Sequence, residues 1–393
     1  MSAYNRCKVT MRFDDGSTIS DWISFTLRDT YTDPLAELQF QCSPTKANRA
    51  EYRKHLKKGH LVSIAIDNVN QGSFLIQTVD RTIGKSGGVV YNLTCKTPLC
   101  TPYEGSVDPD LEVSTQTDTP VSIVILKALA AYGFDRISTD GTEDRSALTG
   151  LTIKGGRLPF PVETLKHQQA KAQEGQTAYQ FAATIFSRLG VCLRMKADGQ
   201  LLISAPDYDQ QPSYTLVQDP TRQKQGDYFI SDIHIHDTNE GQFSECRVRG
   251  ERDENNPDVT QTARPEYTVK ATDLNSKRPA YSADVAAAGY KPSIMRDKNA
   301  RDVKRCKNVG TLALGLKAKD AFTIEGEVDG FRAQTGAMWQ VNTTANVYVA
   351  EEEIDEKMWI LERTFTQDRS GGQRTKVKVL VNGALALGEL PKG

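Results

Sequence analysis

Hydrophobic and polar residues alternate along much of the last part of the chain. The alternation covers Phe322–Asp329, Met358–Phe365 and Lys376–Val381, and a further run extends from Thr335 to Val349. Alternation with a period of two residues is typical of half-buried strands, and glycines between the runs favour turns. Residues 321–380 are therefore predicted to form four short strands in series, none of which presents a cluster of catalytic side chains.

The N-terminal part shows a similar pattern. The predicted strands are Lys8–Phe13, Ile19–Leu27, Leu35–Cys42, Leu61–Ile66, Gly72–Arg81 and Val89–Lys96. The first two flank the turn sequence "DDGS", which indicates a hairpin. A polar and basic segment, residues 45–60, separates the third strand from the fourth and is interpreted as a surface excursion. Residues 1–103 are predicted to form a small antiparallel β-barrel domain.

The middle of the chain has helical spacing instead. Pro120 opens a run with apolar residues at helical intervals, and Gly133 ends it. A second helix begins at Thr177 and ends at Gly190, and a hairpin follows around residues 197–200. Two helices and a hairpin indicate a compact α/β domain over residues 104–206.

The remainder, residues 207–393, returns to strands. Tyr228–His236 and Ser244–Gly250 are predicted strands, followed by a polar arm over residues 253–290 and a basic helix over residues 297–317. The four C-terminal strands then complete a second β-barrel domain. The predicted fold class is α+β and β-rich, with two antiparallel β-barrel domains and an intervening α/β domain.

Composition narrows the possible functions. The chain has 393 residues and a formal net charge of -1, so no general basic field attracts nucleic acid, and no specific nucleic-acid partner is expected. No run approaches the roughly 18 apolar residues needed to cross a bilayer, so no membrane partner is expected either. The N-terminus lacks the apolar segment of a signal peptide, which favours synthesis in a cytoplasm. The seven cysteines have no CxxC spacing and are interpreted as reduced, mostly buried residues.

Two histidines are the main candidates for a metal site. His234 and His236 lie on the same face of a predicted strand, as in zinc peptidases that cleave cell walls. Such a site needs three protein ligands and an open position, and Lys171 occupies the place after His167 where an aspartate would be needed. His55 and His60 lie in the basic segment, which is expected to repel a cation. No metal ligand and no cofactor are therefore assigned.

Other motifs carry little chemistry. The sequence "IGKSGG", residues 83–88, lacks the first glycine of a phosphate-binding loop and precedes a strand, which favours a hairpin turn. Cys95 and Cys100 have no histidine partner nearby in the sequence, so the support for a nucleophilic role is weak. The acidic run Glu351–Glu356 is interpreted as a solvated loop. A glycosidase pair of carboxylates can form from distant residues, so this alternative stays open.

The order of several segments resembles a known family. The sequence "DGF…GAMWQVN" precedes the acidic run, and "WILERTFTQD" and "KVKVLV" follow it; Thr177–Pro206 and Phe243–Asn256 agree earlier in the chain. This order resembles the central baseplate hub protein of Mu-like contractile phage tails, also called the late control protein D or tail hub family. The resemblance covers most of the chain from about Thr177 onward and is looser before it.

The resemblance implies a structural protein rather than an enzyme. Hubs of this kind form a homotrimer on the tail axis, in which two barrels per chain resemble the tail-tube subunit. Three chains then join the six-fold tail tube to the three-fold central spike. The implied partners are the central spike protein, as a separate chain, the tail tube or a tube-adaptor protein, and the baseplate wedge proteins. The implied location is the tail baseplate of the virion.

One residue is predicted to anchor this structure. Trp339 follows the "TGAM" turn and is expected to be buried, because large aromatic residues dominate cores and interfaces. Two other functions stay open. One is a tail-associated cell-wall hydrolase, either a metallopeptidase that uses His234, His236 and a carboxylate or a glycosidase. The other is a receptor-binding module at the tail periphery.

Overall fold

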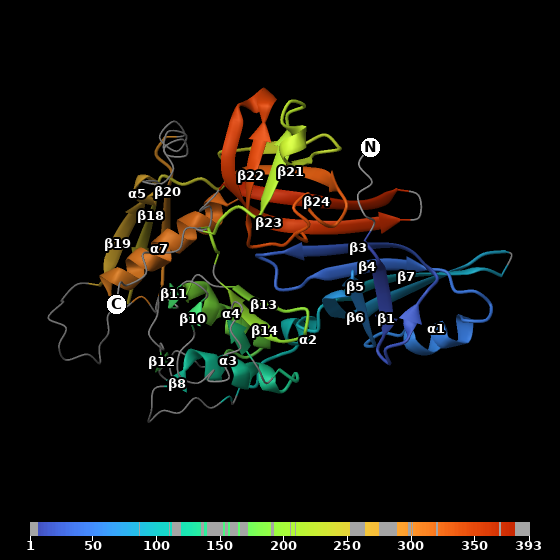
Figure 1. The fold of residues 1–393 in the computed structure, drawn as a ribbon. Coiled ribbons are helices and arrows are strands. Elements are labelled where there is room, and N and C mark those ends of the chain that lie inside the picture. The colour runs from blue at the N-terminus through green and yellow to red at the C-terminus, as the bar shows by residue number, and fades with distance from the viewer. Residues whose placement is uncertain are drawn as a thin grey trace.

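Antiparallel β-sheet dominates the fold, and the helices lie below and beside the sheets in Figure 1. The computed structural model describes residues 7–85, 87–109, 111, 119–134, 137–139, 152–153, 156–157, 164–165, 172–189, 192–204, 206–208, 210–251, 264–274, 289–297, 300, 302–319, 321–368 and 371–381. These residues form a β-rich α+β protein, as the sequence predicts.

Seven strands form the N-terminal group. They are β1 (Val9–Phe13), β2 (Thr18–Ile19), β3 (Trp22–Thr30), β4 (Glu37–Cys42), β5 (Leu61–Ile66), β6 (Val69–Ile83) and β7 (Val89–Lys96). Their order is β3-β4-β7-β6-β5-β1-β2, with antiparallel neighbours. Helix α1 (Arg49–His55) lies in the segment interpreted as a surface excursion. Its Tyr52 and His55 are buried, so this segment also covers the core.

Seven more strands form the C-terminal group. They are β15 (Tyr214–Gln218), β16 (Asp227–Tyr228), β17 (His234–Asp237), β21 (Phe322–Asp329), β22 (Thr344–Val349), β23 (Ile354–Asp368) and β24 (Gly372–Val381). Their order is β16-β15-β22-β23-β24-β21-β17. Strand β15 pairs in parallel with β16 and β22, and the other pairs are antiparallel.

Strand β23 joins the two groups. Residues 354–359 of β23 pair with β22, and residues 362–368 pair with β3 of the N-terminal group. Strand β24 pairs along the opposite edge, with a register shift between Ile360 and Glu362. The fourteen strands of these two groups therefore form one sheet. A single hydrophobic core also runs through both groups, from Cys7 to Val379.

The predicted barrels are not closed by the strand pairing of the described residues. In the C-terminal group, one isolated bridge connects the two sides of the order: Phe229, after β16, bridges Val328 of β21, the neighbour of the last strand, β17. The backbone N–H of Ile230 donates to the carbonyl oxygen of Glu327 at 2.9 Å. This group is therefore curved, but its last contact is a bridge rather than a ladder.

The middle of the chain packs below the sheet (Figure 1). Its helices are α2 (Cys100–Glu104), α3 (Val121–Ala130) and α4 (Ala178–Leu189), and its strands are β8 (Thr119–Pro120), β9 (Ile137–Thr139), β10 (Thr152–Ile153), β11 (Gly156–Arg157), β12 (Thr164–Leu165), β13 (Cys192–Met195) and β14 (Leu201–Ser204). Strands β13 and β14 form the predicted hairpin, and β9 adds to β14 in parallel. These elements have their own core, which includes Leu129, Phe181 and Leu193. The domain limits at residues 103 and 206 stay predictions.

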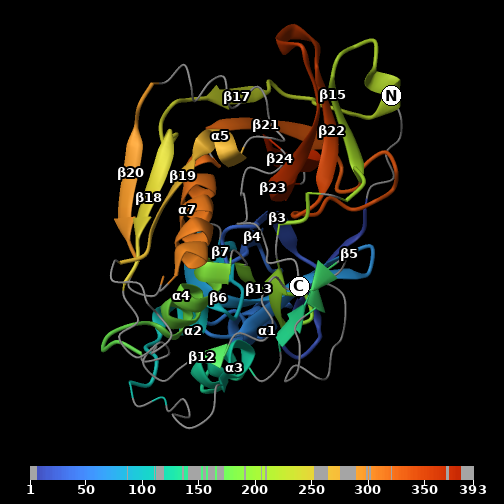
Figure 2. The ribbon, with the colours of Figure 1, turned by 90° about the vertical axis from the view of Figure 1, so that its left-hand side faces the viewer.

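A separate lobe lies beside the C-terminal strands (Figure 2). It consists of β18 (Glu245–Arg249), β19 (Glu266–Lys270), α5 (Ala271–Leu274), β20 (Pro292–Arg296) and α7 (Val303–Ala318). Helix α7 packs on β18 and β19, where a Cβ atom on Gly310 would approach Val269 to 2.8 Å. The polar arm predicted over residues 253–290 is partly sheet, because β19 lies in it, and residues 253–263 and 275–288 lie outside the described residues. None of the described helices is long and apolar enough to cross a membrane.

A buried carboxylate lies beside the bridge at Phe229. Asp227 is 3% exposed, and its carboxylate accepts hydrogen bonds from the backbone N–H of Gln334 at 2.8 and 3.1 Å. Burial raises the pKa of Asp227 to about 6, although these hydrogen bonds favour the ionised form. Asp227 therefore holds the turn before Trp339 at the cost of a buried negative charge.

We expect Asp227→Asn to change the pH dependence of stability. The pKa of Asp227 in the folded state is raised from an ordinary 3.8 to about 6. Its contribution to the free energy of unfolding is therefore largest below pH 4 and is lost as pH rises through 6. The free energy of unfolding of the variant, relative to the wild type, should therefore rise between pH 4 and pH 8, by on the order of 3 kcal/mol at most. Urea denaturation at both pH values measures it, and a difference that is constant with pH would contradict the assignment.

Candidate functional site

Three charged residues meet where the three parts of the chain meet. Asp29 comes from β3, Arg194 from β13 and Arg363 from β23. Asp29 Oδ1 accepts a hydrogen bond from Arg194 Nη2, and Asp29 Oδ2 lies 3.6 Å from Arg363 Nε. Their side chains are only 16%, 13% and 11% exposed. This junction cluster joins the N-terminal group, the middle part and the C-terminal group through one carboxylate.

The positive and negative charges of the junction cluster are unequal in number. Burial opposes ionisation of Asp29, but the charges of Arg194 and Arg363 outweigh it and lower the pKa of Asp29 below its ordinary value. Burial and the charge of Arg194 lower the pKa of Arg363, against the opposing effect of Asp29. One carboxylate thus faces two cations. Such a cluster favours one arrangement of the three parts, because removing a partner leaves an uncompensated buried charge.

The predicted anchor lies directly beside this cluster. Trp339 is fully buried and stacks on Tyr214, with ring centroids 4.4 Å apart. Its carbonyl oxygen accepts a hydrogen bond from Arg363 Nη1. Trp339 lies between β21 and β22 and not in the strand predicted from Thr335 onward. In this turn, Arg332 and Met338 form an isolated bridge. The turn therefore connects the aromatic core to the junction cluster.

A second set of contacts joins the same three parts. Tyr31, which follows β3, donates from its hydroxyl to the carbonyl oxygen of Ser204 in β14 at 2.9 Å. The Tyr31 ring meets Trp359 of β23 edge-on, with centroids 5.0 Å apart. Trp359 Nε1 donates to Asn342 Oδ1 at 3.1 Å, and this oxygen also accepts from the backbone N–H of Asp207 at 2.9 Å. The junction is therefore held by aromatic and polar contacts as well as by charge.

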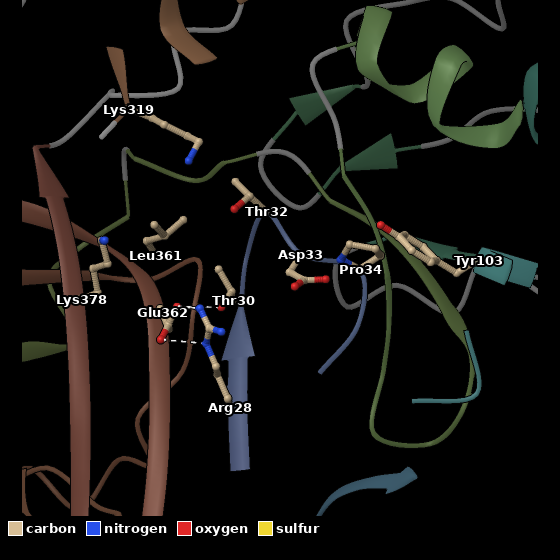
Figure 3. A pocket seen from close by; sticks show the side chains of 10 residues that line it. All are labelled: Arg28, Thr30, Thr32, Asp33, Pro34, Tyr103, Lys319, Leu361, Glu362 and Lys378. Carbon is tan, nitrogen blue, oxygen red and sulfur yellow. Dashed lines mark hydrogen bonds and ion pairs between the residues drawn. The ribbon is translucent and has the colours of Figure 1, made fainter. Parts of the chain in front are cut away.

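A shallow groove of about 400 Å³ opens at the surface near the junction (Figure 3). Its lining residues are Arg28, Thr30, Thr32, Asp33, Pro34, Tyr103, Lys319, Leu361, Glu362 and Lys378. Arg28 donates to both carboxylate oxygens of Glu362, at 3.0 and 2.8 Å. Small-molecule sites are mostly apolar and concave, whereas this wall is largely polar and already paired. The lining of this groove therefore differs from that of a typical small-molecule site.

The structure does not assemble a metal site around the histidines first considered. His234 and His236 lie on β17 with exposed side chains, and their ring centroids are 6.3 Å apart. Within the described residues, three or more potential metal ligands gather only at Asp14, Asp15 and His55. His167 and Lys171 lie outside the described residues. The metallopeptidase alternative therefore lacks a third ligand in the described part of the chain.

The cysteines considered as nucleophiles are poorly suited to that role. Cys95 is fully buried, and burial raises the pKa of its thiol to about 12. Burial also raises the pKa of Cys100. A nucleophilic cysteine acts as the thiolate, which requires a lowered pKa. Gly84, Gly87 and Gly88 lie between β6 and β7 and hydrogen-bond to one another, as expected for a turn.

One member of the junction cluster stands out in the sequence pattern. Arg363 follows Trp359 and Leu361 at alternate positions and precedes Phe365, so an arginine lies on an otherwise apolar face. A charge at such a position indicates a buried partner. The partner could not be identified, because Asp29 is separated from Arg363 by more than 300 positions and Arg194 belongs to the middle part.

We expect Asp29→Ala to destabilise the chain far more than the neighbouring Arg28→Ala. Loss of Asp29 leaves two buried cations without their shared carboxylate, which should cost about 3–5 kcal/mol. Arg28 is 57% exposed, and loss of an exposed pair should cost less than about 1 kcal/mol. Urea denaturation of both purified variants compares the two free energies of unfolding. Similar losses would show that the junction cluster has no special role.

Trp339→Ala should cost about 3–5 kcal/mol, since it removes a fully buried indole. Glu352→Ala is the control, because Glu352 is exposed in the turn before β23 and its loss should change stability by less than about 0.5 kcal/mol. Thermal unfolding and soluble yield measure both changes. An unchanged melting temperature for Trp339→Ala would refute its role as an anchor.

Comparison with known proteins relates the chain to phage tail proteins. No match to a curated protein was found, but residues 317–383 match the family model described as a tail protein, C-terminal domain. This range contains β21 to β24, including the strand that joins the two groups.

Solved structures with the same fold cover nearly the whole chain. A 43 kDa tail protein of prophage MuSo2 from Shewanella oneidensis has a TM-score of 0.70 and 12% identity, over 96% of this chain and 99% of that one. A tail protein from Neisseria meningitidis MC58 has a TM-score of 0.72 and 15% identity, over 97% and 98%. A chain of the Francisella PdpA–VgrG complex has a TM-score of 0.54 and 11% identity, over 99% and 60%. The chain therefore has the fold of phage tail proteins, and its residues 317–383 correspond to a tail protein C-terminal domain.

Proposed function

We propose that this chain is the structural baseplate hub of a contractile phage tail. Three chains would form a ring on the tail axis and join the six-fold tail tube to the three-fold central spike. The tail-protein fold and the match of residues 317–383 support a tail component. The order of sequence segments that resembles Mu-like hubs supports the more specific assignment.

The observation that carries this proposal is the shared strand β23. It pairs with β22 of one β-rich group and with β3 of the other, so the two groups are held in one fixed relation. In a trimer, six such groups would be presented in alternation around an axis. A hub that matches six subunits with three needs this fixed relation within each chain, because flexible groups could not hold a regular ring.

Free strand edges suggest how copies could meet. In the fourteen-stranded sheet formed by described residues, β2, β16 and β17 each pair with one strand only. An unpaired edge can accept a strand from another chain, and ring closure would cover every such edge. We therefore propose that neighbouring copies pair near these edges, with the middle part on the outside of the ring.

The proposed partners follow from this position. They are two further copies of the chain, the central spike protein, the tail tube or a tube-adaptor protein, and the baseplate wedge proteins. One solved structure with this fold comes from a complex that contains VgrG, which is consistent with a spike-related partner. The chain would be synthesised in the host cytoplasm and would be located in the baseplate of the virion.

The copy number in a defined complex tests the proposal. The full chain and its spike protein, produced together and purified as a complex, should contain three copies of the chain by light scattering. Obligate interfaces of roughly 2,000–5,000 Å² should keep this complex intact on dilution. One or six copies would contradict the hub assignment. A chain that binds cells or degrades cell wall without the spike would support the receptor-binding or hydrolase alternative.

A further inference from the structure

The outer edge of strand β6 is unpaired in its second half. Strand β5 pairs with β6 up to Leu75, and the backbone N–H of Gly59 then donates to the carbonyl oxygen of Ile76 at 2.9 Å. Among the described strands, residues 77–83 of β6 pair with β7 alone. A free strand edge can pair with another chain, so this half of β6 is a surface that a neighbouring molecule can cover.

The end of the β6–β7 hairpin carries an exposed apolar residue and is tied to helix α1. Ile83, the last residue of β6, is 74% exposed. Strand β4 ends opposite Tyr91, so Ile83 and its partner Val89 have no third described strand beside them. Arg49 Nη2 donates to the carbonyl oxygen of Gly87 at 2.9 Å, which holds the turn of the hairpin against α1. A two-stranded ribbon is only marginally stable in water, so this end gains stability from a partner that covers it.

Basic side chains surround this free edge. The surface is termed the basic arm and consists of the described residues of 46–59 and 77–88. Its exposed acidic residues are Glu51 and Asp80, and its exposed basic residues are Lys46, Arg53, Lys54, Lys57, Lys58, Arg81 and Lys85. Lys57 and Lys58 directly precede the residue that contacts β6, so their charges lie where the free edge begins.

Nearby carboxylates do not neutralise the basic arm. Asp14 and Asp15, in the turn between β1 and β2, contact the imidazoles of the adjoining segment. The charge of Lys54 also stabilises the Asp15 carboxylate. Arg53 and Lys57 form no ion pair with any described residue, and the same is true of Lys58. The basic arm therefore has positive charge without a partner in the described part of its own chain.

The hairpin between β22 and β23 ends in a tip of opposite charge, termed the acidic tip. It consists of the 3-10 helix η3 (Ala350–Glu352), Glu353 and the first residues of β23. Asp355 of this tip pairs with Arg222 at 3.0 Å. The exposed glutamates of the tip form no ion pair with any described residue; they are Glu351, Glu352, Glu353 and Glu356. Like charges held together repel one another, so the acidic tip favours a partner of positive charge.

The basic arm and the acidic tip lie at different ends of the chain. In the sheet order, β23, β3 and β4 separate β22 from β7 and β6. Helix α1 packs further along, on β1, through Tyr52 and Phe13. Figure 1 shows α1 at the lower right and β22 near the top. The two surfaces can therefore meet only between copies of the chain.

Two unpaired ends of the sheet lie beside these same surfaces. Strand β2 is followed by Asp21, whose Oδ2 accepts a hydrogen bond from Nδ2 of Asn48, the residue before α1, at 2.9 Å. At the other end, Arg222 precedes β16 by five residues and pairs with Asp355 of the acidic tip. One head-to-tail contact would therefore bring together opposite charges and the sheet ends at β2 and β16.

We propose that the basic arm of one copy binds the acidic tip of the next copy, head to tail. This inference rests on the proposed ring of copies and assigns its contact surfaces. A contact between two different surfaces of identical chains closes into a ring when its rotation permits. Complementary charges speed the encounter and exclude other orientations, because like charges brought together are costly. The free edge of β6 and Ile83 would be covered in the same contact.

Cross-linking of the wild-type chain, in its purified complex with the spike protein, tests this docking directly. A carbodiimide joins a carboxylate to a lysine that it contacts. Mass spectrometry should identify peptides in which residues 351–356 are joined to Lys57 or Lys58. Because these surfaces lie at different ends of one chain, such a link joins two copies. Absence of the link in a complex with three copies would overturn the docking and leave the hub assignment intact.

Charge reversal tests the same contact by its strength. The tip variant carries Glu352→Lys and Glu356→Lys, and the arm variant carries Arg53→Glu and Lys57→Glu. Each should raise the dissociation constant between copies of the full chain about tenfold or more, since like charges would face each other. A variant with all four changes restores opposite charges and should return to within about threefold of the wild type. Sedimentation equilibrium measures these constants.

A variant with Glu104→Lys and Glu174→Lys is the matched control. It changes the net charge as much as the tip variant does, at two exposed positions of the middle part, and should alter the constant by less than about twofold because distant surface charges are screened. Equal weakening by this control, or no recovery in the variant with four changes, would overturn the docking. A complex with six copies that still forms the cross-link would instead contradict the hub assignment and support the docking.

Discussion

Strand β23 has two edges, and three strands share them. Strand β24 takes one edge, while β22 and β3 divide the other at the register shift between Ile360 and Glu362. Backbone hydrogen bonds are obligatory for a buried strand, so neither β-rich group satisfies β23 alone. If β3 were absent, residues 362–368 would expose an unpaired edge beside a large hydrophobic core. The two groups are consequently held together by strand pairing as well as by a shared core.

The junction cluster lies where β3 and β23 pair, and it adds the middle part to this unit. Asp29 and Arg363 are register partners across these strands, and Arg194 approaches from β13. Buried ion pairs contribute little net stability compared with apolar packing, because each charge loses its hydration. Their main effect is on the specificity of docking, because any other position of the middle part leaves the buried Arg194 without its carboxylate. Tyr31 and Trp359 supply the apolar contact that makes the selected arrangement stable.

The sequence predicted the elements better than their partners. Alternation located β21, β23 and β24, because one face of each is solvated. However, β23 begins at Ile354, inside the acidic run interpreted as a loop, and β22 begins only at Thr344. Helix α1 was missed because its polar composition hides two buried residues, Tyr52 and His55. Strands β15 and β20 were missed because they are five residues long and lie between polar segments. The junction cluster could not be predicted, since sequence pattern gives the face of Arg363 but not the residue opposite it.

The same limitation explains why the sequence of the basic segment does not predict the surroundings of His55. In sequence, His55 and His60 are surrounded by Arg53, Lys54, Lys57 and Lys58. In the fold, α1 turns His55 toward the core, and the β1–β2 turn brings Asp14 and Asp15 to it, while Lys57 and Lys58 remain exposed. The charges next to His55 in the sequence are therefore those exposed to solvent. The residues that contact the imidazole are set instead by the fold, in which β1 pairs with β5. For a protein whose proposed role is to hold one fixed geometry, the informative residues are those that connect distant segments: Asp29, Arg363 and His55.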